Sequence, residues 1–150
     1  MGTAGKTVSG RCLCGAVTFS ADVAKHDVDV CHCSMCRRWS AGPFMGLMHE
    51  GEVVFGGAEN IGVYKSSDWG ERAFCKLCGT PLYWHLSGSD TYSFSAGALD
   101  DQSGLRFTME IFVDEKPAFY EFANDTLRLT GAEAMAALAG GAKSEEARDG

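Results

Sequence analysis

The sequence predicts a mainly β protein, and two observations carry this prediction. Short runs of β-branched and aromatic residues recur along the chain, each bounded by Gly, Asn or Asp. With 150 residues, 45% of them hydrophobic and 22% charged, the chain has the size of one compact domain. No repeat or linker interrupts its middle, so we expect a domain over residues 10–130, an N-terminal extension over 1–9 and a helical, flexible tail over 131–150.

The predicted strands follow from alternation of polarity. Val17 and Phe19 share one face of an extended segment while two hydroxyl residues share the other, and residues 92–96 alternate in the same way. Both segments are therefore expected to be half-buried strands. The full set of predicted strands is Ala16–Ser20, Glu52–Phe55, Ile61–Lys65, Arg72–Phe74, Leu82–Leu86, Tyr92–Ala96, Phe107–Val113 and Ala118–Phe122.

Helical signals are confined to two segments. Residues 130–139 consist mainly of good helix formers, and Thr130 with Glu133 three residues later has the pattern of a capping box. The Gly140-Gly141 pair is expected to end this helix. A shorter helical turn is expected over residues 34–40, where a C-x-x-C loop folds back on itself.

The net charge and the distribution of apolar residues argue against two classes of partner. Thirteen Lys and Arg residues against twenty Asp and Glu give a net charge of −7, which disfavours binding to nucleic acid. No apolar run approaches the roughly 20 residues of a membrane-spanning helix, and the first ten residues lack the apolar core of a signal peptide. We therefore expect a cytoplasmic protein without a nucleic-acid or membrane partner.

The seven cysteines form the strongest functional signal. An odd number cannot pair completely within one chain, and a cytoplasmic location disfavours disulfides. Such clustering is typical of metal ligands. The cysteines fall into three groups with none left over: Cys12 and Cys14; Cys31, Cys33 and Cys36; Cys75 and Cys78.

The spacing of these groups favours zinc. Two residues between cysteines let backbone N–H groups turn toward the sulfurs while both reach one tetrahedral ion at about 2.3 Å. Four thiolates close one site, and the remaining three leave a fourth position open, which distinguishes catalytic from structural zinc. We expect two zinc ions per chain, one on a four-cysteine cluster (Cys12, Cys14, Cys75, Cys78) and one on a three-cysteine cluster (Cys31, Cys33, Cys36).

Two alternatives remain open from the residues alone. His32 could complete the second site, although in an extended segment its ring points away from the neighbouring cysteines. The two C-x-x-C units could instead share one ion, as in a zinc ribbon that joins Cys33 and Cys36 to Cys75 and Cys78, although their separation exceeds the usual ribbon spacing.

The cysteine groups and their neighbours resemble the glutathione-dependent formaldehyde-activating enzyme family, which includes the centromere protein V domain. The three blocks occur in the family's order, and the resemblance covers about residues 10–123. The blocks are Gly10–Val17, Cys31–Arg37 and Arg72–Leu82, with further agreement at Gly97–Asp101 and Ile111–Pro117.

This resemblance implies a β-tent fold of small antiparallel sheets held by zinc. It also implies a structural ion on the four-cysteine cluster and a catalytic ion on the three-cysteine cluster. The activity of the family is the condensation of formaldehyde with glutathione to S-(hydroxymethyl)glutathione, classed as a carbon–sulfur lyase reaction in reverse. A small thiol such as glutathione and an aldehyde are the partners that follow.

Four arginines lie within three residues of a cysteine: Arg11, Arg37, Arg38 and Arg72. In an acidic protein this local positive charge can hold the carboxylates of glutathione. Arg37 and Arg38, next to the three-cysteine cluster, are the candidate substrate-binding residues. The alternative is that the arginines offset thiolate charge and support the ligands by hydrogen bonds.

The leading hypothesis is thus a zinc-dependent carbon–sulfur lyase, with Cys31, Cys33 and Cys36 at its catalytic centre. Three thiolates give the zinc site a net negative charge, which weakens the Lewis acidity of the ion. Such a site favours holding a thiol over activating water. Two other classes compete with this hypothesis. They are a non-catalytic binding module stabilised by zinc, and a thiol redox or metal-buffering protein.

Overall fold

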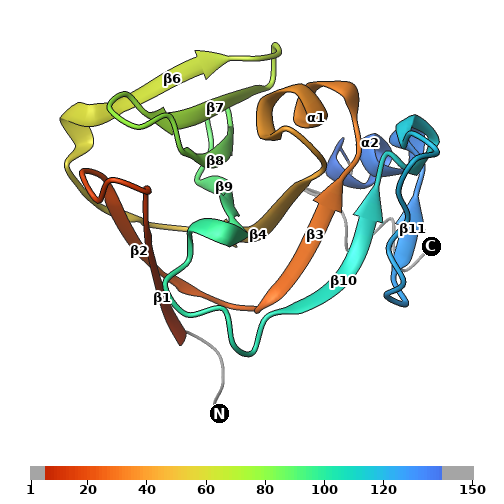
Figure 1. The fold of residues 1–150 in the computed structure, drawn as a ribbon, viewed down its shortest axis with the longest axis horizontal. Helices are drawn as coiled ribbons and strands as arrows, with labels where there is room; N and C mark the ends of the chain where they lie inside the picture. The colour runs from red at the N-terminus through yellow and green to blue at the C-terminus, as the bar shows by residue number, and fades with distance from the viewer. Residues whose placement is uncertain (1–5, 140–150) are drawn as a thin grey trace. The chain divides into compact units, whose positions relative to one another are not determined.

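The computed structural model describes residues 6–139, which form two compact units (Figure 1). Within this range the first unit consists of residues 6–29 and 45–107, and the second of residues 30–44 and 108–139. Strands predominate over helices in the described chain, so the mainly β prediction is confirmed.

The first unit contains a three-stranded antiparallel sheet. Its order is β1-β2-β5, with β1 at Lys6–Arg11, β2 at Thr18–Val23 and β5 at Val54–Gly56. Each pairing is antiparallel, and β1 pairs with β2 along its whole length. Residues 6–9, expected in an N-terminal extension, thus belong to the first strand of this sheet.

The same unit holds a longer antiparallel series in the order β4-β9-β8-β7-β6. The register of β7 against β8 shifts between Ala73 and Phe74, which places an irregularity directly before Cys75. The strands are β4 at Phe44–Glu50, β6 at Ile61–Lys65, β7 at Gly70–Cys75, β8 at Pro81–Leu86 and β9 at Thr91–Ser95.

Strand β6 has the predicted bounds, and six other strands overlap their predicted segments. The burial of the side chains confirms the alternation predicted around Val17 and Phe19 but not the one predicted over residues 92–96. Val17 and Phe19 are 0% and 2% exposed, and the Phe19 ring stacks on that of Phe94 at 4.8 Å between centroids. Ser93, expected on a solvent face, is only 6% exposed. The prediction that this strand is polar and exposed on one face was therefore wrong at Ser93, whereas Ser95 on the same face is partly exposed.

The second unit combines short strands with both helices. β10 at Arg106–Ile111, whose last four residues lie in this unit, pairs in parallel with β11 at Leu127–Leu129. Strand β3 at Asp27–Cys31 enters the unit at Val30 and leads into α1. Helix α1 spans Ser34–Ser40, as predicted.

Helix α2 spans Gly131–Ala139 and begins with the predicted capping box. The backbone N–H of Thr130 donates to Glu133 Oε1 at 2.8 Å, and the N–H of Glu133 donates back to Thr130 Oγ1 at 3.2 Å. The predicted stop at Gly140-Gly141 and the charged tail after it lie outside the described residues. Within residues 6–139, neither helix has the length and apolar character that crossing a membrane requires.

The predicted strand at Ala118–Phe122 was wrong, because this segment forms a turn and then irregular chain. The Lys116 ammonium donates hydrogen bonds to the carbonyl oxygens of both Pro117 and Tyr120, which curls the backbone around one side chain. Three short 3₁₀ turns complete the described chain, at Ala58–Asn60, Ala96–Ala98 and Val113–Glu115.

Gly57 gives a test of the packing between the strands of the first unit. It has a φ of 68°, and a Cβ there would lie 1.8 Å from the backbone oxygen of Ala16. We expect Gly57→Ala to lower the free energy of unfolding by about 2–4 kcal/mol, through the left-handed backbone and the clash. Urea unfolding measures this, with Gly97→Ala as control because nothing lies within 4 Å of its Cβ position. Equal stability of the two variants would contradict the packing described.

Candidate metal centres

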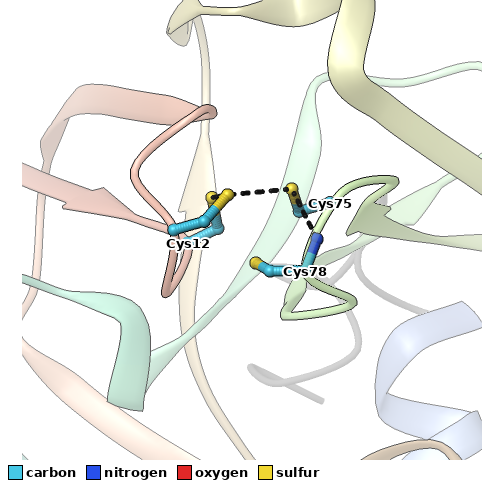
Figure 2. A group of neighbouring side chains, drawn as sticks. Cys12, Cys75 and Cys78 are labelled. Atoms are coloured by element: carbon cyan, nitrogen blue, oxygen red, sulfur yellow. Dashed lines mark hydrogen bonds between the residues drawn. The ribbon is translucent and has the colours of Figure 1, made fainter.

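The four-cysteine cluster forms within the first unit (Figure 2). The sulfur atoms of its four members all lie within 4.8 Å of one another. The Cys14 sulfur is 3.7 Å from that of Cys12 and 3.8 Å from that of Cys75. One pair follows β1 in the turn before β2, and the other lies at the end of β7 and in the turn before β8. The loops between these strands therefore bring the two pairs together.

Backbone N–H groups point at these sulfurs. Those of Leu77 and Cys78 donate to Cys75 Sγ at 3.3 and 3.4 Å, and that of Val17 donates to Cys12 Sγ at 3.3 Å. Such bonds stabilise thiolate over thiol, and thiolate is the form that binds metal. Gly79, with a φ of 85°, provides the left-handed turn that follows the second pair.

Thr80 connects the two loops of the four-cysteine cluster. Its hydroxyl oxygen accepts the N–H of Leu13 at 3.0 Å and forms a hydrogen bond with Cys78 Sγ at 3.2 Å. This hydrogen bond from the Thr80 side chain lowers the pKa of Cys78 to about 5. One side chain thus ties the loops together and favours thiolate at a ligand position.

The three-cysteine cluster forms within the second unit. The sulfurs of Cys31, Cys33 and Cys36 lie within 4.8 Å of one another. Cys31 ends β3, Cys33 caps α1, and the N–H of Cys36 donates to Cys33 Sγ at 3.3 Å. Cys33 and Cys36 are buried, with Phe44 and Phe112 packed around the cluster.

The electrostatics of this cluster favour a bound cation. Hydrogen bonds from Cys31 and Cys36 lower the pKa of Cys33 to about 2, whereas the hydrogen bond to Cys33 raises the pKa of Cys31. The Cys33 thiolate is therefore stabilised at the expense of ionisation at Cys31. A divalent ion removes this conflict, because it lets all three sulfurs carry charge in a buried site. The donor set thus fits a thiophilic metal such as zinc, and no disulfide joins any of the seven cysteines.

The sulfur positions bear on both alternatives left open by the sequence. Among residues 6–139 the cysteines group as four and three, and not as the ribbon-type pairing. His32 is 0% exposed, and both its ring nitrogens have other partners, namely Tyr120 and Glu110. The histidine therefore lies beside the three-cysteine cluster without joining it.

The four candidate arginines differ in their partners. Arg11 lies 3.7 Å from Asp100, and buried Arg72 donates from Nε to Ser66 Oγ. Arg37 and Arg38 both lie in the last turn of α1, the helix that carries Cys36. Arg37 donates from Nε to the backbone oxygen of His32 at 2.9 Å, and Arg38 is exposed.

Sequence reasoning missed three side chains around the clusters: Thr80, Glu110 and Tyr120. Glu110 is 1% exposed and bonds to His32. An acidic residue within the apolar run 107–113 was the signal that could have identified it, since a buried carboxylate requires a partner. No pattern in the sequence connects Tyr120 or Thr80 to the cysteines.

These features define a mainly β protein with two cysteine clusters, each arranged so that it can hold a metal ion. Residues 7–115 match the family described as glutathione-dependent formaldehyde-activating enzyme. The chain belongs to this family, and the resemblance noted in the sequence is confirmed.

Two individual proteins extend this comparison. A Schizosaccharomyces pombe protein described as an uncharacterized lyase is 35% identical over 130 residues, covering 86% of this chain and 95% of that protein. The crystal structure of a Rhodobacter sphaeroides protein is similar with a TM-score of 0.52 at 24% identity, covering 67% of this chain and 99% of the other. The latter likeness supports the fold, which has the small antiparallel sheets and short C-terminal helix expected for its class.

Thr80 offers a test of the four-cysteine cluster. We expect Thr80→Val to lower the free energy of unfolding by about 1–2 kcal/mol, because it removes the acceptor for Leu13 N–H and the donor to Cys78 while keeping the volume. Thr80→Ser retains the hydroxyl and is the matched control in urea unfolding of the metal-loaded protein. A Ser variant as unstable as the Val variant would show that the hydroxyl is not what stabilises the loops.

Proposed function

We propose that this protein is a zinc-dependent carbon–sulfur lyase of the S-(hydroxymethyl)glutathione synthase type. In the synthetic direction the sulfur of a small thiol bonds to the carbonyl carbon of an aldehyde, and the thiol proton ends on the former carbonyl oxygen. The reverse reaction breaks the same carbon–sulfur bond. Membership of the glutathione-dependent formaldehyde-activating family and the lyase description of the S. pombe relative support this class of reaction.

The difference between the two clusters is the observation that carries the proposal. Four sulfurs satisfy a tetrahedral ion, so we assign Cys12, Cys14, Cys75 and Cys78 to a structural zinc. Three sulfurs leave one position for substrate, so we assign Cys31, Cys33 and Cys36 to a catalytic zinc. When bound there, zinc supplies a positive centre that holds a thiolate or polarises a carbonyl oxygen.

The residues of the chain supply orientation and charge around this position. Cys31, Cys33 and Cys36 direct three sulfurs to one point from the end of β3 and the start of α1. Phe44 and Phe112 pack against the cluster and limit the access of water on that side. The combined negative charge of three thiolates exceeds the positive charge of a divalent cation, which favours holding a thiol over ionising water.

Arg37 and Arg38 are assigned to the carboxylates of the thiol substrate. Glutathione carries two carboxylates, and guanidinium groups pair with such groups in a bidentate geometry. Arg37 uses its Nε to bind the His32 carbonyl, so its terminal nitrogens are the part assigned to substrate.

We also place the protein in the cytoplasm, because clustered cysteines that act as thiolate ligands require a reducing compartment.

The function is tested by metal content and activity together. We expect two zinc ions per chain by elemental analysis of protein purified without chelators, and faster exchange between formaldehyde and its glutathione adduct by NMR. Cys33→Ser is expected to retain the fold and one zinc ion and to reduce exchange to the uncatalysed rate. Cys75→Ser is expected to lower the soluble yield, because Cys75 lies in the core of the first unit.

Three outcomes would contradict this assignment. Wild-type protein with two zinc ions and only the uncatalysed exchange rate would exclude this pair of substrates. A single zinc ion per chain would leave the three-cysteine cluster as a redox or buffering group instead. Equal collapse of the Cys33→Ser and Cys75→Ser variants would contradict the division into structural and catalytic ions.

Arg38 gives a separate test of substrate binding. We expect Arg38→Ala to raise the KM for glutathione about 2- to 5-fold with little change in kcat, since an exposed charge pair contributes about 0.2–1 kcal/mol. Arg37→Ala is expected to lower metal content as well, because the bond to the His32 carbonyl is lost. Arg106→Ala, an exposed arginine paired with Asp27 in the first unit, is the matched control. An unchanged KM in Arg38→Ala would remove Arg38 from the substrate site.

A further inference from the structure

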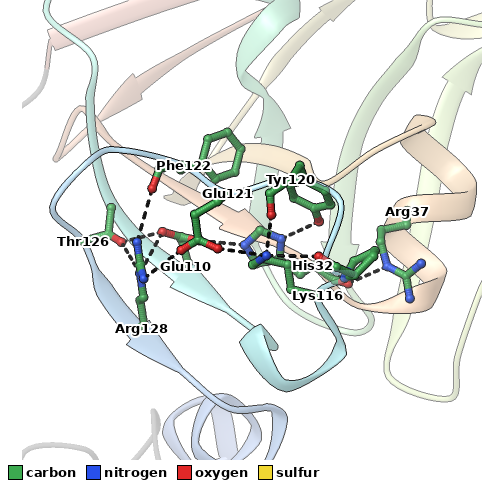
Figure 3. A network of polar contacts seen from close by, with 10 residues as sticks. His32, Arg37, Glu110, Lys116, Tyr120, Glu121, Phe122, Thr126 and Arg128 are labelled. Carbon is green, nitrogen blue, oxygen red and sulfur yellow. Dashed lines mark hydrogen bonds and ion pairs between the residues drawn. The ribbon is translucent and has the colours of Figure 1, made fainter.

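His32, the residue between two cysteines of the three-cysteine cluster, has a partner for every polar group that it carries. Its backbone N–H donates to the oxygen of Ile111 at 3.0 Å. Its backbone oxygen accepts from Arg37 Nε at 2.9 Å (Figure 3). Its ring Nε2 lies 2.8 Å from Glu110 Oε1, and Nδ1 lies 2.7 Å from the Tyr120 hydroxyl. Four bonds from three different segments therefore fix one buried residue.

Glu110 is itself held in place by a second set of contacts. Its other carboxylate oxygen accepts from Thr126 Oγ1 at 2.6 Å and from Arg128 Nε at 3.2 Å. Burial alone would raise the pKa of this carboxyl, but the bonds from Thr126 and His32 and the Arg128 charge hold it below the usual range. The group facing His32 is thus a carboxylate, so ring Nε2 donates its proton to it.

The connection to the metal ligands is covalent. Adjacent Cα atoms are about 3.8 Å apart across a planar peptide, so a residue fixed through both of its peptide groups and its side chain also fixes its neighbours. The neighbours of His32 are Cys31 and Cys33, two of the three sulfurs that converge. Their spacing is therefore set by protein contacts as well as by any bound ion.

We propose that His32, held by Glu110, is the positioning residue that arranges Cys31 and Cys33 for metal binding and keeps its own imidazole out of the coordination sphere. This inference rests on the proposed function in one respect, namely that the three-cysteine cluster holds a metal ion. It goes beyond that function by assigning the geometry of the open site to a network of side chains that are not ligands.

The energetics of burial support a positioning role over simple stabilisation. Burying a histidine and a carboxylate carries a desolvation cost, and well-packed apolar residues at such positions are often as stable or more so. Apolar residues form no directional hydrogen bonds, whereas both ring nitrogens of His32 do. Because both nitrogens are engaged, the imidazole does not compete with substrate for the fourth metal position.

Most partners in this network lie beyond the family match, which ends at residue 115. Tyr120, Thr126 and Arg128 all come from the following segment, and Arg128 also bonds to Glu121 and to the oxygen of Phe122. The part of the chain after the matched region thus completes the support of the second metal centre.

The test is a titration of full-length, metal-depleted protein with Co²⁺, whose charge-transfer and d–d absorption reports the number and kind of its ligands. Cys33→Ser provides the spectrum of the four-cysteine site alone. We expect His32→Leu and Glu110→Leu to weaken Co²⁺ binding at the three-cysteine site about 10- to 100-fold while the other site is unchanged. His32→Gln places a donor near the position of Nε2, and we expect it to restore most of the lost affinity.

A matched control is available in the first unit, where His85 Nδ1 lies 3.0 Å from Glu71 Oε2. Neither residue belongs to a cysteine cluster. Glu71→Gln is expected to leave both Co²⁺ sites unchanged. Should His32→Leu fail to fold, Tyr120→Phe decides the question, since it removes one bond to the ring and keeps its volume. A weaker three-cysteine site, with an altered d–d spectrum, is then expected.

The outcomes separate this inference from the proposed function. Wild-type protein that binds a single Co²⁺ would overturn both. Two ions in the wild type, together with unchanged affinity and spectrum in the folded His32 and Glu110 variants, would overturn the positioning role alone. Lower thermal stability with an unchanged Co²⁺ spectrum would assign the network to folding and likewise reject the inference.

Discussion

The repulsion between neighbouring thiolates is the constraint on which the rest of the structure depends. Seven cysteines are gathered into two groups whose sulfurs lie within 4.8 Å of one another, and thiolates at this separation repel one another unless a cation offsets their charge. The raised pKa of Cys31 beside the lowered pKa of Cys33 is the direct expression of this conflict, which arises from their mutual hydrogen bond. A cation would relieve this conflict, and the fold arranges each group so that it can hold one.

The two clusters are supported by different means. In the first unit the candidate ligands come from the turn between β1 and β2, the end of β7 and the turn after it, so a metal ion there would join two segments that Thr80 also connects. In the second unit all three ligands lie within six residues, and hydrogen bonds to His32 hold their backbone. An ion in the first cluster would thus connect distant parts of the chain, whereas the segment of the second cluster is also held by protein contacts.

The sequence was informative wherever the signal was local. Cysteine spacing gave both clusters, the Thr130 and Glu133 pair gave the start of α2, and alternation placed Val17 and Phe19 in the core. Strand β3 was missed because its two aspartates are disfavoured in strands, although valine alternates with them. Strand β4 was missed because it contains Gly and Glu, which are also disfavoured. The partners of His32 could not be predicted, since Glu110 and Tyr120 are 78 and 88 residues away.

A site with an open position needs a way to hold three ligands without recruiting a fourth. The imidazole of His32 is a nitrogen donor that lies between two of the candidate ligands along the chain. Its engagement by Glu110 and Tyr120 removes that donor from competition, and the Thr126 and Arg128 bonds keep the carboxylate in place. The polar network is therefore understood better as a device that excludes a ligand than as a source of stability, because apolar packing would serve stability equally well.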